Sequence, residues 1–160
     1  MSRLRLIPAL ALAVSLLAAP APAQASGKTT VTWTKIDVPD KDNAAALTKS
    51  LKAILTKAAK KANFGKAKKV SFSVKLVELT SEQKGDVHRV TCTIVGRIPG
   101  GPSAKSRISF GGSPAEKAKL EKQVLTMVAK AVVTRLAEIV RSRAAKEEAA
   151  KEEAARDADD

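Results

Sequence analysis

The hydrophobic positions of this chain follow two different spacings, which predict strands in some segments and helices in others. Residues 29–38 are rich in β-branched side chains and stop before a proline, so they predict a first strand. Asp40 or Asp42 can then cap a helix. Apolar residues recur there at helical spacing, and Asn63 and Gly65 provide the stop. This apolar stripe consists of Leu47, Leu51, Ile54, Leu55, Ala58 and Ala62.

Three later segments alternate with a period of two and predict an antiparallel meander. Residues 70–76 form the first of these strands, and residues 81–86 form the turn that follows it. The second strand covers residues 87–98, and a loop rich in proline and glycine, 99–103, leads to a shorter strand at 106–110. The side chains expected to face the core are Val70, Phe72, Val74, Leu76, Val90, Cys92, Ile94, Ile98 and Phe110.

A long amphipathic helix is predicted after the last strand. Ser113 can cap it, Pro114 suits its first position, and Glu116 completes a capping box. A helix from Pro114 to residue 150 is about 55 Å long, so its last turns project beyond a sheet. Its apolar stripe is expected to contain Leu120, Val124, Met127, Val128, Ala131, Leu136, Ile139 and Val140.

The element order β-α-β-β-β-α predicts an α+β fold, a two-layer sandwich with a four-stranded mixed sheet and both helices on one face. The first two strands are expected to be parallel, and the later ones antiparallel. Residues 26–143 make up this single domain. Residues 144–160 repeat small and charged residues, which predicts a solvated helical extension with a disordered acidic end over 156–160.

The first 25 residues have the pattern of an export signal. Arg3 and Arg5 form a cationic start, an apolar run follows over residues 6–19, and small residues lead to cleavage after Ala25. A membrane span needs about 20 apolar residues, so this run is short for one, and an uncleaved anchor is the alternative. The predicted location is therefore periplasmic or secreted, with a soluble chain after cleavage.

Cys92 is the only cysteine of the chain. No cysteine lies directly after the predicted cleavage site, so the sequence predicts that the protein is not a lipoprotein. A single cysteine also cannot form an internal disulfide. Small secreted eukaryotic domains usually carry several disulfides, which favours a bacterial envelope as the setting. Cys92 itself is expected to be either a buried strand thiol or half of a disulfide between two chains.

The formal net charge of +13 is unevenly distributed. Residues 26–143 contain 24 bases and 9 acids, whereas residues 144–160 contain three bases and seven acids. A basic body attracts polyanions, which outside the cytoplasm means lipid phosphates, lipopolysaccharide, acidic polysaccharide or shed nucleic acid. The simpler interpretation is that the lysines keep a small exported domain in solution.

The sequence offers little material for catalysis. His88, the single histidine, precedes Cys92 by four residues in one strand, which separates them by about 13 Å. This distance is too long for a nucleophile and its base, or for two ligands of one metal ion. The sequence therefore predicts no enzyme, no metal site and no cofactor. His88 is expected at an exposed strand end, and Glu78, Glu82 and Asp86 as solvated turn residues.

The second face of the predicted sheet is the main candidate for a functional surface. The strand positions that alternate with the core positions carry cations and small hydroxyl side chains, and they share the other face of the sheet. An ordinary solvated face is the simpler interpretation, and an anion-binding or partner-binding surface is the alternative. No aromatic residue interleaves these positions, so no specific nucleic-acid binding is expected. The five candidate residues are Lys75, Arg89, Arg97, Lys105 and Arg107.

The layout resembles small periplasmic α/β domains of bacterial envelope assembly, namely the amino-terminal domain of TolB, the LpoB-type activators of peptidoglycan synthases and the CsgG-like secretion factors. The resemblance covers residues 29–143 and includes the terminal amphipathic helix over 124–140. It implies an exported, non-catalytic accessory module that binds another envelope protein. The alternative is electrostatic binding of an anionic envelope polymer or lipid, such as lipopolysaccharide, phospholipid or polysaccharide.

Overall fold

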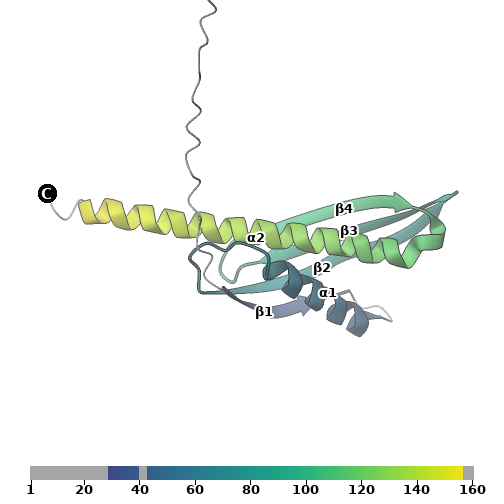
Figure 1. The fold of residues 1–160 in the computed structure, drawn as a ribbon, viewed down its shortest axis with the longest axis horizontal. Coiled ribbons are helices and arrows are strands. Elements are labelled where there is room, and N and C mark those ends of the chain that lie inside the picture. Colours follow the sequence, from purple (N-terminus) through teal and green to yellow (C-terminus); the bar gives the residue numbers. More distant parts are fainter. Residues whose placement is uncertain (1–28, 40–42, 157–160) are drawn as a thin grey trace, which may run out of the picture.

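A computed structural model describes residues 29–39 and 43–156 and has the predicted order of elements (Figure 1). The predicted signal, its cleavage site at Ala25, and the candidate caps Asp40 and Asp42 lie outside the described residues. The elements are β1 (Thr30–Asp37), α1 (Ala44–Ala59), β2 (Lys69–Lys84), β3 (Val87–Arg97), β4 (Ser103–Gly112), a 3₁₀ turn (Pro114–Glu116) and α2 (Lys117–Arg156).

The four strands form one sheet in the order β1-β2-β3-β4. β1 pairs with β2 in parallel, and the other two pairs are antiparallel. Both helices lie on one side of this sheet, where α2 follows β3 and β4 and α1 packs beside α2 (Figure 1). The predicted α+β two-layer sandwich with a mixed sheet is therefore confirmed.

α2 buries a wider face than the predicted stripe. Leu125, Val132 and Val133 are buried although the stripe omitted them, and Met127, which it included, is 39% exposed. The helix contacts the sheet on one side and α1 on another. Two contact surfaces require a wider apolar face than the narrow stripe of a helix with one neighbour.

α2 lies directly against β3 at Gly96. A Cβ atom at Gly96 would lie 2.8 Å from both Leu136 Cδ1 and Val132 Cγ1. Gly96→Val is therefore expected to lower the free energy of unfolding by about 1–3 kcal/mol, because the helix or its side chains must shift. Chemical denaturation measures this loss of stability. Gly100→Ala is not a suitable control, because Gly100 has a positive φ and a substitution there would add backbone strain. A Gly96→Val variant as stable as the parent protein would show that α2 is not packed this closely.

β2 is longer than predicted, because it continues through the segment expected to be a turn. The register shifts between Leu76 and Glu78, which indicates a β-bulge around Val77 that changes the alternation of side chains. The turn contains only Gly85 and Asp86, and Gly85 has a φ of 57°. Glu78 and Glu82 are consequently strand residues, and their prediction as turn residues was wrong.

Three further local predictions were wrong. His88 is only 4% exposed rather than at the surface, and its Nε2 lies 2.5 Å from Ser81 Oγ, which gives the buried imidazole a polar partner. Phe110 is 52% exposed although its position in the alternation faces the helices. The predicted capping box is absent because Pro114–Glu116 forms a 3₁₀ turn and the Ser113 side chain makes no capping hydrogen bond.

The end of α2 projects beyond the sheet (Figure 1). Lys66 Nζ donates a hydrogen bond of 2.9 Å to Glu148 Oε1, and this contact raises the pKa of Lys66. Arg156 is helical rather than part of a disordered end, and residues 157–160 lie outside the described part. Among the described helices, none combines the length and apolar composition needed to cross a membrane.

Candidate functional site

The sheet surface opposite the helices, here called the open sheet face, carries the outward side chains of all four strands. The alternation of buried and exposed positions places all five sequence candidates on it, and each of them is exposed. The sequence analysis therefore assigned their side of the sheet correctly. Serine and threonine side chains occupy many of the positions between them, including Thr32, Ser71, Ser73, Thr91 and Ser109.

The strand register groups four of the five candidates and separates the fifth. Lys75 and Lys105 both pair with Val95, and Arg97 is two residues further along β3. Arg107 pairs with Thr93, two residues in the other direction. Arg89 lies four residues from Thr93, about 13 Å along the strand, beside Glu82. The cationic part of the open sheet face thus lies toward the end formed by the β3–β4 loop.

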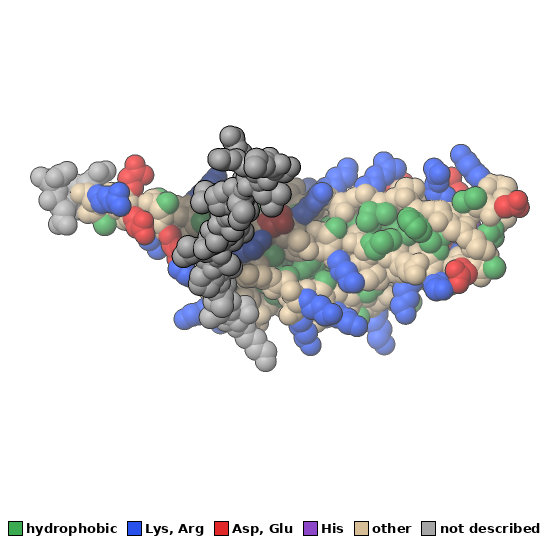
Figure 2. All heavy atoms as spheres, turned by 45° about the horizontal axis from the view of Figure 1, so that its top comes forward, with side chains coloured by type: hydrophobic (Ala, Val, Ile, Leu, Met, Phe, Trp, Pro, Cys, Tyr) green, Lys and Arg blue, Asp and Glu red, His purple; other side chains and the backbone are tan. Residues whose placement is uncertain are grey.

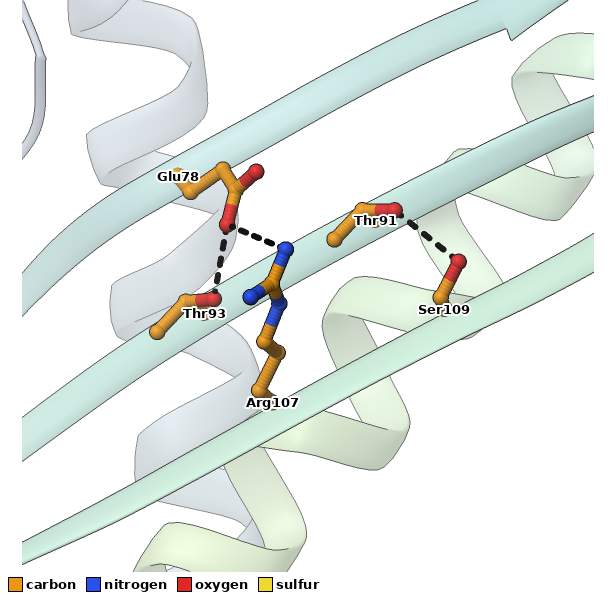
Figure 3. A network of polar contacts seen from close by, with 5 residues as sticks. All are labelled: Glu78, Thr91, Thr93, Arg107 and Ser109. Carbon is orange, nitrogen blue, oxygen red and sulfur yellow. Dashed lines mark hydrogen bonds and ion pairs between the residues drawn. The ribbon is translucent and has the colours of Figure 1, made fainter.

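Two carboxylates in the sheet neutralise part of this charge. Glu78 Oε2 accepts a 3.0 Å hydrogen bond from Thr93 Oγ1 and lies 3.6 Å from Arg107 Nη2, with Thr91 and Ser109 hydrogen-bonded alongside (Figure 3). Asp37 Oδ2 lies 3.8 Å from Lys75 Nζ and 3.9 Å from Lys35 Nζ. The open sheet face is therefore a mixed polar surface that carries carboxylates beside its cations and hydroxyl groups.

Further cations reach the same end of the sheet from α2. A shallow groove lies between β4 and α2, here called the edge groove, and Arg135, Arg143 and Lys146 line it together with Lys105 and the carboxylate of Glu138. Arg135 Nη1 donates to the backbone oxygen of Lys105. The α2 cations were not among the candidates predicted from the sequence. Their helical spacing places them on one face, but nothing in the sequence shows that this face borders β4.

Cys92 lies in the core, on the helix side of β3, and is fully buried. Burial raises the pKa of its thiol to about 12, and the nearby negative charge of Glu78 adds to the shift. A protonated thiol inside the core is a poor nucleophile and a poor metal ligand. Of the two possibilities left open by the sequence, the structure therefore favours the buried free thiol. Within residues 29–39 and 43–156, no three His, Cys, Asp or Glu side chains gather as metal ligands.

Comparison with solved structures supports the fold. The chain is similar to a Xanthomonas campestris protein of the DUF330 family, with a TM-score of 0.52 and 14% identity over 79% of this chain and 94% of that one. Weaker similarity links it to the PelC dodecamer from Paraburkholderia phytofirmans, with a TM-score of 0.39, 16% identity and coverage of 71% and 91%. A minor lipoprotein from Acinetobacter baumannii has a TM-score of 0.32, 13% identity and coverage of 69% and 95%.

These likenesses establish the architecture alone, and only the first is close enough to do so. No protein-family model and no curated protein matches the sequence. The chain accordingly shares a small α+β fold with a DUF330 protein.

Proposed function

We propose that this chain is an exported, non-catalytic accessory module of the bacterial cell envelope that binds another envelope protein. The observation that carries the proposal is the one-sided sheet. Both helices pack on one face, and no described element covers the other. An uncovered sheet face is available to a partner, and the export signal predicted from the sequence favours a partner outside the cytoplasm.

The distribution of charge supports a protein partner over a simple polyanion. Lys75 and Arg107 lie near the carboxylates of Asp37 and Glu78, and hydroxyl groups fill the positions between them. Donors and acceptors of both signs suit the directional contacts of a protein interface, because electrostatic complementarity confers specificity on such interfaces. A polymer or lipid surface of uniform negative charge would meet carboxylates as well as cations on this face.

Site-specific photo-crosslinking in cells tests the proposal. A benzoylphenylalanine at Ser71, exposed on the open sheet face, is expected to yield one dominant adduct with a second protein. The matched control carries the same group at Lys52, an exposed position of α1 on the opposite side of the molecule. A smear or no adduct from Ser71, or the same adduct from Lys52, would contradict the proposal.

A second candidate function is electrostatic binding of lipopolysaccharide, phospholipid or acidic polysaccharide. The edge groove favours it, because Lys105, Arg135, Arg143 and Lys146 gather around a single carboxylate there. If this function holds, binding to vesicles that contain phosphatidylglycerol will fall steeply with added salt, since exposed charges are screened within about 10 Å at 0.1 M. Reversing the charges of Arg97 and Lys105 will then weaken binding more than reversing Lys52 and Lys57 on α1.

A further inference from the structure

β4 is an edge strand whose outer side pairs with no described strand. Natural edge strands are usually short, bulged or interrupted by proline, because an open edge recruits other strands. β1, the opposite edge, has eight residues and a register shift between Trp33 and Lys35. β4 has ten residues, no register shift and no proline. Of the features that prevent strand addition, the β4 edge therefore has charged side chains, Lys105 and Arg107, but is neither short, bulged nor interrupted by proline.

The hydrogen bonding of the hairpin fixes which backbone groups point outward from β4. In an antiparallel pair, residues bonded to the partner strand alternate with residues whose N–H and C=O point away. Ile98 N–H donates to Pro102 O, so the backbone N–H and C=O groups of the even-numbered β4 residues point toward β3. Those of the odd-numbered residues point outward, and Arg135 donates to the outward carbonyl of Lys105. Arg107, Ser109 and Gly111 follow with the same period and present their N–H and C=O groups at the edge.

The side chains along this edge differ on the two faces. Phe110 lies on the helix side, opposite the buried Val90, yet it is 52% exposed, whereas Ala104 and Ser106 on the same face of β4 are buried. Figure 2, in which the β4 side of Figure 1 is turned forward, shows hydrophobic side chains gathered in the middle of the body with Lys and Arg around them.

On the open sheet face, the edge carries Lys105 and Arg107, and Glu78 Oε2 lies 3.6 Å from Arg107 Nη2. On the α2 side, Arg135, Arg143 and Lys146 border the adjoining edge groove together with the single carboxylate of Glu138. A second copy of β4 added antiparallel to the first would bring these cations close to their own equivalents, which destabilises the pair. An added strand with acidic side chains would meet opposite charges instead.

We infer that β4 accepts an extended, acidic segment of the partner protein as a fifth strand. This inference rests on the proposed function and names the docking edge and the chemistry of the bound segment. Alternate side chains of that segment are acidic, toward Lys105 and Arg107, and the side chains between them are apolar, toward Phe110. Main-chain hydrogen bonds to Arg107, Ser109 and Gly111 supply affinity, and the alternating side chains set the register.

A designed peptide tests the edge directly. The probe alternates glutamate with valine over about eight residues, the length of an ordinary strand, and the control peptide has lysine in place of each glutamate. We expect the acidic peptide alone to bind, with slower amide hydrogen exchange at Arg107, Ser109 and Gly111 by NMR. This readout needs no variant. Equal binding of both peptides, or binding without protection of these amides, would overturn the inference.

Two variants at one position separate the backbone from the side chain. Ser109→Pro removes an outward N–H, which an edge strand tolerates, and is expected to weaken peptide binding by about tenfold through lost main-chain hydrogen bonds. Ser109→Ala removes the hydroxyl and keeps the N–H, so its affinity is expected to stay within about threefold of the parent protein. Similar losses in both variants would mean that the backbone edge is not the contact.

Crosslinking in cells distinguishes failure of this inference from failure of the proposed function. Benzoylphenylalanine at Phe110 is expected to give the same protein adduct as benzoylphenylalanine at Ser71. An adduct from Ser71 without one from Phe110 overturns the edge and leaves the proposed function standing. An adduct from Phe110 with a second copy of this chain overturns the acidic partner. The absence of an adduct from both positions overturns the edge and the proposed function together.

Discussion

Phe72→Ala is expected to lower the free energy of unfolding by about 3–5 kcal/mol, which is a large part of the stability of a typical domain. Phe72 is fully buried, and its ring centroid lies 5.7 Å from that of Trp33 and 5.8 Å from that of Phe64. The substitution removes a large apolar side chain and both ring contacts, and leaves a cavity between β1, β2 and the loop after α1. Urea denaturation followed by circular dichroism measures the loss.

Ser71→Ala is the matched control for this prediction. Ser71 is the neighbouring residue on β2 but is exposed on the open sheet face, so its truncation is expected to change stability by less than about 0.5 kcal/mol. Trp33 is the only tryptophan, and its fluorescence reports the same region independently. A loss below about 1 kcal/mol for Phe72→Ala would contradict the position of Phe72 in the core.

Cys92 is expected to react with thiol reagents about 1,000-fold more slowly in the folded protein than in the unfolded chain at pH 8. Its pKa is raised from the ordinary 9.0 to about 12, and only the thiolate reacts. The rate of labelling with an aromatic disulfide reagent, followed with and without denaturant, gives the ratio of the reaction rates in the unfolded and folded states. Because the chain has a single cysteine, no other thiol contributes to the signal. Equal rates in both states would show that Cys92 is accessible in the folded protein.

The same shift predicts how stability depends on pH. The folded pKa lies above the unfolded value, so the stabilisation by the protonated thiol is fully present below pH 9 and is lost as the pH rises toward about 12. Across this range the unfolded chain ionises first. The parent protein is therefore expected to lose more stability between these two pH values than Cys92→Ala does. Parallel pH profiles of the two proteins would contradict the raised pKa.

Most of the fold could be predicted from periodicity, and the exceptions have local causes. Alternation from Val70 to Leu76 identified the core face of β2, but the bulge at Val77 shifted the alternation and concealed the rest of the strand. Phe110 has the parity of a core residue, yet parity does not reveal that β4 is an edge. His88 was expected at an exposed strand end, but β2 continues past it and brings Ser81 against its Nε2.

The side of the sheet on which the candidate residues lie could be predicted, but the residues that lie next to them could not. The alternation placed Lys75, Arg97, Lys105 and Arg107 on one side of the sheet, which the structure confirms. The pairing of Arg107 with Glu78 depends on the register between three strands, and the position of Arg135 beside Lys105 depends on how α2 crosses the sheet. Both are tertiary relationships that spacing along one segment does not contain.

The central claim is that this module binds a protein of the envelope rather than an anionic polymer or lipid. Affinity capture of the full chain from its own envelope fraction, washed at low and at high salt, tests it most directly. We expect one protein to remain bound after the high-salt wash, because main-chain hydrogen bonds and apolar contacts are screened far less than exposed charge pairs. Release of all bound material by salt, with only lipid or polysaccharide in the eluate, would contradict the account.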